Sequence, residues 1–296
     1  MIIQHNMAAA NTNRQLGITT GNIAKSTEKL SSGFKINRAG DNAAGLTISE
    51  KMRAQIRGLE QASTNAQDGI SLIQTAEGAL NETQSILQRM RELAVQASND
   101  TNVSADRAAI SKELNALIDE VDRIAKDTEF NKMKLLNGSL EDGYSGTLEY
   151  GDVGLTGNEL NLQVGANEGQ NISLEIKSMR AGKLGLSKIT VPITDTDNVV
   201  GSHEKATEYI TTIQGALDQV SEARSDLGAL QNRLEHTIAN ADNTAENLQA
   251  AESRIRDVDM AKEMVKFAKD TILQQAAQSM LAQANQQTQG VLALLQ

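Results

Sequence analysis

The sequence predicts a mainly α-helical chain whose long helices pack as a coiled-coil rod. A small β-hairpin region is expected within it, and the N- and C-terminal helices are expected to pair as a separate inner domain. Aromatic residues make up only 2% of the 296 residues, so the chain lacks the side chains that bring the most burial to a globular core. The single proline, Pro192, leaves few places where a helix must end. Apolar residues, 39% of the chain, recur every seven residues, which is the spacing of a coiled-coil seam.

Residues 1–33 carry a thin apolar stripe. Every seventh position is apolar, while the seam positions between them are polar. The two rows are Ile2, Ala9, Leu16, Ile23 and Leu30, and then His5, Thr12, Thr19 and Ser26. Because a stripe one residue wide cannot hold a lone helix together, this segment needs a partner.

From Met52 onward the heptad pattern of apolar residues becomes more regular, and it predicts three long helices. The first, on the order of 75 Å long, is expected to end at Ser98–Asp100. Ser104 is expected to cap the second helix, and the third begins near Glu204. Their seams are Leu59, Ala66, Ile73, Leu80, Leu87 and Ala94 in the first, Ile110, Leu114, Leu117, Val121 and Ile124 in the second, and Ile213, Val220, Leu227, Leu234, Ala241, Leu248 and Ile255 in the third.

Residues 137–201 differ from the rest of the chain in composition and pattern: they contain many Gly, Asn and Asp residues, and their apolar residues alternate with polar ones. Two alternating runs, 160–164 and 172–176, flank the turn segment 165–170, which predicts a β-hairpin. The expected organisation follows from these boundaries. Residues 1–45 and 256–296 form the paired terminal helices, and residues 46–255 form a helical rod of which 137–201 is the β- and turn-rich part.

The C-terminal segment contains no ionisable side chain from Thr271 to Gln296. Its apolar stripe continues the heptad spacing and could pair with the N-terminal stripe as a coiled coil: Leu273, Ala276, Met280, Ala284, Val291 and Leu294. Glutamine and asparagine residues interrupt the stripe, so the segment is not a membrane span. Uncharged faces on both terminal segments suit close packing of many identical copies, which extend into a helical filament if the contact does not close into a ring.

The net charge of −10 argues against a nucleic-acid partner, because the phosphate backbone demands a basic face. No basic region followed by an apolar run opens the chain, so we expect no Sec-type signal peptide. The three histidines lie in separate segments without ligand spacing, and there is no cysteine. We therefore expect no catalytic, cofactor or metal site, and an enzyme is the least favoured class.

Five stretches, in this order, carry a family resemblance. They are SSGFKINRAGDNAAGLTIS at residues 31–49, LQRMRELAVQ at 87–96, VGANEGQ at 164–170, ESRIRDVDMAKEM at 252–264 and ILQQAAQSMLAQANQ at 272–286. Together they resemble bacterial flagellin, the subunit of the flagellar filament, in a short form without the outer variable domains. The resemblance implies that the paired termini form an inner-tube domain and that the three long helices with the hairpin form an outer-tube domain.

The same resemblance implies partners and a location. The chain is expected to leave the cell unfolded through the flagellar type III export apparatus, after an export chaperone has held its C-terminal segment. It is then expected to polymerise with copies of itself beneath the filament cap protein, beyond the hook-junction proteins. The residues expected to make terminal assembly and chaperone contacts are Ile2, Leu16, Ile23, Leu30, Leu273, Met280, Val291, Leu292, Leu294 and Leu295.

The stretch LQRMRELAVQ also resembles the face of flagellin read by a host Toll-like receptor of innate immunity. The residues implied are Arg89, Met90, Arg91, Leu93 and Glu113. Heptad counting puts Leu87 and Ala94 in the seam, so Arg89 and Leu93 are expected to share an exposed flank. A simpler interpretation is that Arg89 and Glu113 form a lateral salt bridge in a filament, with Leu93 packed beneath a neighbour.

Two other classes of protein remain as alternatives. A hook–filament junction adaptor would resemble flagellin at its termini, although the match here also runs through the three long helices. A coiled-coil signalling hairpin would share the long heptads, but it would need a helical tip and a membrane anchor in place of the glycine-rich β region.

Overall fold

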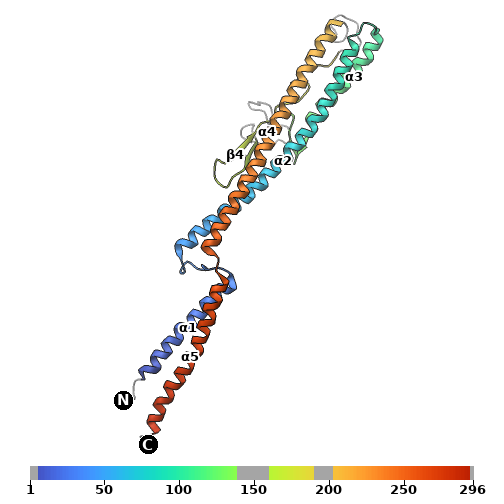
Figure 1. Ribbon diagram of the computed structural model, residues 1–296. Helices are drawn as coiled ribbons and strands as arrows, with labels where there is room; N and C mark the ends of the chain where they lie inside the picture. Colours follow the sequence, from blue (N-terminus) through green and yellow to red (C-terminus); the bar gives the residue numbers. More distant parts are fainter. Residues whose placement is uncertain (1–5, 139–159, 190–202, 294–296) are drawn as a thin grey trace. The chain divides into compact units, whose positions relative to one another are not determined.

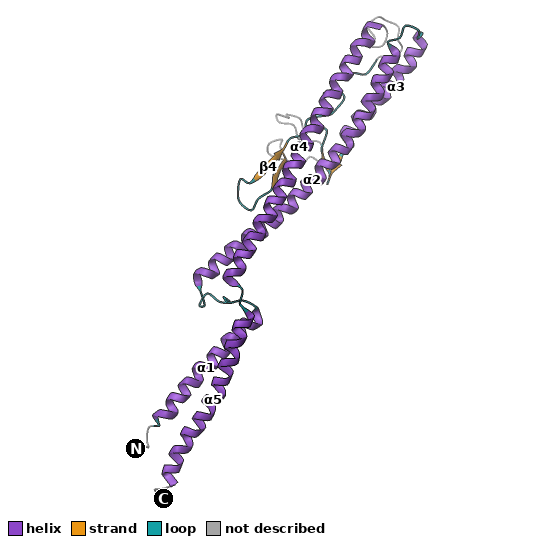
Figure 2. Ribbon diagram, viewed as in Figure 1, coloured by secondary structure: helices purple, strands orange, loops and turns teal. Residues whose placement is uncertain are grey.

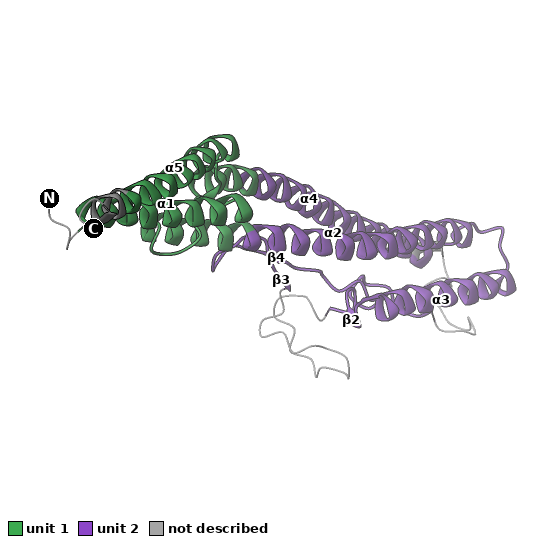
Figure 3. Cartoon of the chain, turned by 90° about the horizontal axis from the view of Figure 1, so that it is seen from below, with its two compact units in different colours: residues 1–56, 245–296 green, residues 57–244 purple. Residues whose placement is uncertain are grey.

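The computed structural model describes residues 6–138, 160–189 and 203–293, which form five helices and two short β-hairpins (Figures 1 and 2). The predicted mainly α fold with long helices and a β-hairpin is confirmed. The chain divides into two compact units, coloured in Figure 3. Unit 1 comprises Met1–Ile56 with Ala245–Gln296, and unit 2 comprises Arg57–Thr244.

Unit 1 contains the pair of terminal helices, α1 (Met7–Ser32) and α5 (Met260–Ala293), which lie side by side (Figure 1). The side chain of Asn6 caps α1 by accepting a hydrogen bond from the Ala9 amide at 3.0 Å. Gly33 ends the helix in the left-handed conformation, with φ of 76°, where a residue with a Cβ would be strained.

Unit 2 is built on the long helices α2 (Ala43–Ala97), α3 (Ser104–Asp127) and α4 (His203–Arg256). The predicted seams form its core from Ala66 to Ala94 in α2 and from Ile213 to Leu234 in α4, and the central residues Ile73, Leu80 and Ile213 are fully buried. The seam of α3 is shifted from the prediction. Ile118 and Ala125 are buried at the positions expected for Leu117 and Ile124, which are only half-buried.

The start of α3 corrects the expected cap. Ser104 is the first helical residue, and Val103 occupies the N-cap position without a side-chain hydrogen bond. The carboxylate of Asp106 instead accepts a hydrogen bond from the Val103 amide at 3.3 Å. An acidic group in the first turn therefore replaces the hydroxyl that the sequence suggested.

Two hairpins follow α3. The strands β1 (Glu129–Phe130) and β2 (Met133–Lys134) are joined by Asn131 and Lys132, both at positive φ. The predicted hairpin is present as β3 (Leu160–Gln163) and β4 (Asn171–Leu174), antiparallel with Leu160 opposite Leu174.

The segment after β4 runs along the helices as a strap, residues 176–189, that the sequence did not reveal. The amide of Ala181 donates to the Asp122 carboxylate at 2.9 Å. Asn115 in α3 exchanges two hydrogen bonds of 2.7 Å with the backbone of Ile189. The strap also closes the core with its buried side chains Ile176, Met179, Ala181, Leu184, Leu186 and Ile189.

The β3–β4 hairpin packs so closely on α2 that the helix carries glycine at the contact. A Cβ on Gly58 would lie 2.8 Å from the Ala166 Cβ, and a Cβ on Gly69 would lie 2.5 Å from Leu162 Cδ1. Glycine is normally unfavourable within a helix. These two glycines therefore mark where the hairpin docks.

We predict that Gly58→Ala lowers the free energy of unfolding by about 1 kcal/mol, because overpacking against Ala166 outweighs the gain in helix propensity. Gly78→Ala in the same helix is the matched control, because no atom lies within 4 Å of its added Cβ. That change should raise the free energy of unfolding by about 1 kcal/mol. Urea denaturation followed by circular dichroism measures both, and equal stabilisation by both substitutions would contradict the close docking.

Candidate assembly surfaces

The seam between α1 and α5 follows the predicted heptad on α1. Ala9, Thr12, Leu16, Thr19, Ile23, Ser26 and Leu30 are its less exposed positions. The facing positions on α5 are Glu263, Phe267, Asp270, Gln274, Ala277, Leu281 and Ala284. Most of the positions in this second row are polar or small, so the seam buries little apolar surface.

Polar bonds cross this seam at three levels. Ser26 Oγ donates to Glu263 Oε1 at 2.7 Å. Gln274 Nε2 donates to Thr20 Oγ1 at 3.3 Å, and Asn6 Nδ2 donates to the Ala284 carbonyl at 3.0 Å. The donated bond from Ser26, with a further one from Lys266, holds the pKa of Glu263 below its ordinary value.

The apolar residues of α5 lie largely outside the seam. Leu273 and Met280 are 44% and 58% exposed in the single chain, so the apolar stripe to which they belong does not face α1. They share this exposure with other large apolar side chains of α1 and α5: Met7, Ile18, Met260, Met264, Val265 and Ile272. The pair thus leaves several large apolar side chains exposed to its surroundings.

The other predicted terminal contact residues are placed as follows. Leu16, Ile23 and Leu30 are half-buried on the seam side of α1. Val291 and Leu292 lie in α5, where their side chains are outside the described part of the structure. Ile2, Leu294 and Leu295 lie outside the described residues.

The predicted recognition patch is only partly on the surface. Arg89, 52% exposed on α2, forms a 2.9 Å ion pair with Glu113 of α3 and a 3.1 Å pair with Glu92. These hydrogen bonds raise the pKa of Arg89 above its ordinary value. The structure thus pairs Arg89 and Glu113 within one chain, where the sequence suggested a contact between copies.

The apolar members of that patch are buried. Leu93 is 2% exposed and Met90 is 0% exposed, because both belong to the core of unit 2. The expectation of an exposed Arg89–Leu93 pair is therefore wrong. Arg91 is exposed, so the charged residues of the patch are accessible to solvent. Its apolar residues are buried in the core beneath them.

A cation–π cluster, which the sequence analysis missed, ties together two connections in unit 1. The ring of Phe34, between α1 and α2, lies 4.7 Å from the Arg256 guanidinium carbon and 6.0 Å from that of Arg53. Arg256 also pairs with Glu50 at 2.6 Å, and Arg53 pairs with Glu252 at 2.8 Å. One of the few aromatic residues in the chain is thus placed where two connections meet.

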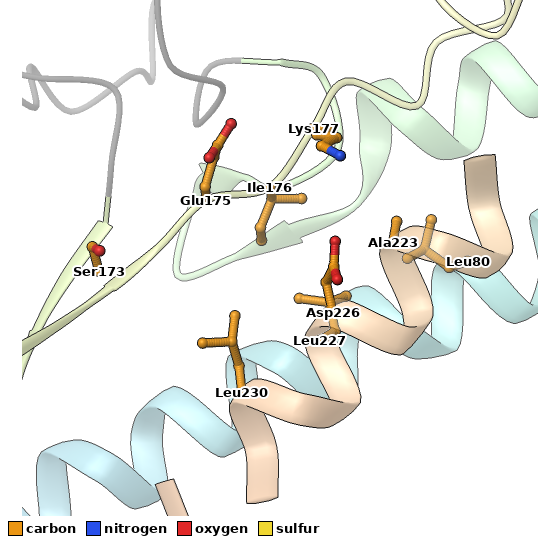
Figure 4. A pocket seen from close by; sticks show the side chains of 9 residues that line it. All are labelled: Leu80, Ser173, Glu175, Ile176, Lys177, Ala223, Asp226, Leu227 and Leu230. Atoms are coloured by element: carbon orange, nitrogen blue, oxygen red, sulfur yellow. The ribbon is translucent and has the colours of Figure 1, made fainter. Parts of the chain in front are cut away.

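A surface pocket of about 230 Å³ lies between the strap and α4 (Figure 4). Its apolar floor includes Ile176 and Leu227, and the carboxylates of Glu175 and Asp226 stand exposed at its rim. Lys177 pairs with Glu222 at 3.4 Å. No nucleophile stands beside a base among these lining residues, so the pocket gives no argument for a reaction.

Within the described residues, no three histidine, cysteine or acidic side chains come together as metal ligands would. None of the described helices has a stretch both long and apolar enough to cross a membrane.

Comparison with known proteins identifies the family. Residues 3–141 match the bacterial flagellin N-terminal helical region, and residues 210–295 match the bacterial flagellin C-terminal helical region. Flagellin of Halalkalibacterium halodurans is 56% identical over 295 residues and flagellin of Bacillus subtilis 51% over 312, and each comparison covers both chains completely. A crystal structure of Bacillus cereus flagellin covers 64% of this chain and 94% of its own, at 28% identity and a TM-score of 0.44.

Long helices packed along narrow seams, with large apolar side chains left exposed on the terminal pair, are typical of a structural protein. The chain belongs to the bacterial flagellin family. It is a structural subunit that assembles with copies of itself into the flagellar filament, outside the cell, and serves motility.

We predict that Ser26→Ala weakens the α1–α5 pair by about 1 kcal/mol at neutral pH, because Glu263 loses a hydrogen bond to its charged form. The pKa of Glu263 is lowered in the folded chain, so this contribution is present above the ordinary glutamate value of 4.5. It disappears as the pH falls through the lowered folded value. Amide exchange protection of α1, measured on both proteins at each pH, tests this.

Thr27→Ala is the control for this measurement, because that exposed hydroxyl bonds only to the Ile23 carbonyl of its own helix. It should leave the pH dependence unchanged. A Ser26→Ala deficit that persists undiminished in acid would show that the bond to ionised Glu263 is not its cause.

Proposed function

We propose that the terminal helices build the filament contacts, through the large apolar side chains that α5 exposes. Leu273, Ile272 and Met280 carry the argument, because all three are exposed in the single chain. Burying each one between copies contributes about 1.5–3 kcal/mol. The part of α5 that follows Asp270 bears no charged side chain. Identical neighbours can therefore approach this part without like-charge repulsion.

The domain roles follow from the same observation. Residues 1–45 and 256–296 act as the inner-tube assembly domain, and residues 46–255 act as the outer-tube domain. Support comes from where apolar surface remains uncovered. Most of the large exposed apolar residues lie on α1 and α5, whereas the seams of unit 2 are closed by its own helices.

The exposed apolar side chains of α5 also suit a partner before assembly. A cytosolic export chaperone covers these side chains and keeps them from pairing with other copies, and the chain is secreted through the flagellar export apparatus. The filament then displaces the chaperone because both use the same side chains. Growth takes place under the cap protein, on a base formed by the hook-junction proteins.

We expect Leu273→Asp to abolish filament formation while the variant stays soluble, because an unpaired carboxylate would enter a packed contact. Leu273→Gln should raise the critical concentration for polymerisation about tenfold, since it removes apolar burial without adding charge. Leu273→Met is the control and should polymerise as the native chain does. Sedimentation and electron microscopy measure all three, and native polymerisation by Leu273→Asp would exclude this contact.

The second proposed role concerns the host. Single chains, but not filaments, bind the Toll-like flagellin receptor through the charged surface formed by Arg89, Arg91 and Glu113. The three side chains are exposed on adjacent helices, and the buried Leu93 fixes the helix surface beneath them. Filament packing over this surface would hide it.

Arg89→Ala should weaken receptor binding by single chains at least tenfold, as is usual when a central interface arginine is truncated. Arg123→Ala provides a matched control, because Arg123 is also exposed and also pairs with two carboxylates, those of Glu120 and Asp127. A binding titration with the receptor ectodomain compares the two variants. Equal affinity of the two, or equal binding by intact filaments, would contradict the proposed surface.

A further inference from the structure

The exposed methionine side chains of this chain are gathered on its two terminal helices. Of the nine methionines in the sequence, four are largely exposed in the described part of the chain, and all four lie on α1 or α5. These four exposed methionines, 47% to 75% accessible, are Met7, Met260, Met264 and Met280. Their sulfur atoms are therefore open to small molecules in solution.

The other described methionines are shielded by packing. Met90 and Met179 belong to the core of unit 2, where they are 0% and 3% exposed. Met52 and Met133 are half-buried. Because the rate at which a sulfur atom is oxidised follows its exposure, an oxidant should react first with the terminal helices.

The chemistry of the chain leaves methionine as the main target. There is no cysteine, whose thiolate is the usual first target of a peroxide. With hydrogen peroxide, the methionine sulfur attacks one oxygen atom and the O–O bond breaks. The hydroxide that leaves takes the remaining peroxide proton and becomes water, so the sulfur is oxidised by two electrons and the peroxide is reduced. The product is methionine sulfoxide, a polar and chiral side chain in place of an apolar one.

The four exposed methionines lie on the helices to which we assigned the contacts between copies. A thioether is flexible and fits irregular apolar contacts, whereas a sulfoxide oxygen needs a hydrogen-bond donor when it is buried. Met260 and Met264 are four residues apart on α5, so they share one flank of the helix. Their oxidation would place two polar groups next to each other in the same contact.

We propose that the four exposed methionines form an oxidation-sensitive site, at which hydrogen peroxide produces sulfoxides in the single chain and so prevents its assembly. Methionine sulfoxide reductases restore the thioether, which makes the loss reversible. The selective oxidation depends only on exposure in the single chain. The loss of assembly rests on the filament contacts proposed above.

The first test measures where the oxygen is added. The full-length protein is kept as single chains, treated with hydrogen peroxide and analysed by peptide mass spectrometry. The four exposed methionines should be oxidised at least tenfold faster than Met90 and Met179. The helix content measured by circular dichroism should stay unchanged, because none of the four belongs to the core of unit 2. Equal rates at exposed and buried positions, or a loss of helix, would overturn the proposal.

The second test measures assembly. Oxidation should raise the critical concentration for polymerisation at least tenfold, and treatment with methionine sulfoxide reductases A and B should return it to the native value. The test variant carries leucine at all four exposed positions: Met7→Leu, Met260→Leu, Met264→Leu and Met280→Leu. It keeps apolar side chains of similar volume, so it should polymerise as the native chain does with or without peroxide.

The matched control carries Met90→Leu and Met179→Leu, and it should remain as sensitive to peroxide as the native chain. Native polymerisation by the oxidised chain, or equal sensitivity of the four-leucine variant, would overturn the proposal. Leu273→Asp, described above, tests the filament contact separately because it involves no sulfur. Loss of assembly on oxidation in the native chain but not in the four-leucine variant supports the oxidation-sensitive site, whatever Leu273→Asp does.

Discussion

The narrowness of the helix seams is the constraint on which the rest of this structure depends. A helix that buries only one stripe of Leu, Ile and Ala gains little per turn, so stability must accumulate over many turns. Unit 2 meets this requirement with α2 and α4, helices of 55 and 54 residues that extend beyond it into unit 1. α3 and the strap complete its core. Their buried side chains cover apolar surface that two helices alone would leave exposed.

Much of this architecture could be predicted because a heptad is visible in one helix without knowledge of its partner. The seams of α2 and α4 and the β3–β4 hairpin follow from local spacing. The strap could not be found in this way, since its burial has no period and depends on bonds such as Asn115 to Ile189. The prediction that Leu93 is exposed was wrong for a related reason. A helix with neighbours on two sides buries more than one stripe of its residues.

Which face of α5 meets α1 could not be predicted from the sequence, and the reason is also physical. Heptad counting assumes that the apolar row faces the partner helix. In α5 the apolar residues Leu273 and Met280 lie on the exposed surface, and polar or small residues such as Gln274 and Ala277 face α1. Nothing within a single sequence distinguishes a seam closed inside the chain from one completed by other copies.

The α1–α5 pair therefore differs from a typical soluble coiled coil, because its seam mixes polar and apolar side chains while further large apolar side chains lie on its surface. Such an arrangement is unfavourable for an isolated chain, since Leu273 and Met280 keep their contact with water. With the filament contacts proposed above, the same arrangement favours assembly, because neighbouring copies then cover the apolar surface of the pair. The free energy missing from the single chain is then supplied by association, which links folding of the termini to growth of the filament.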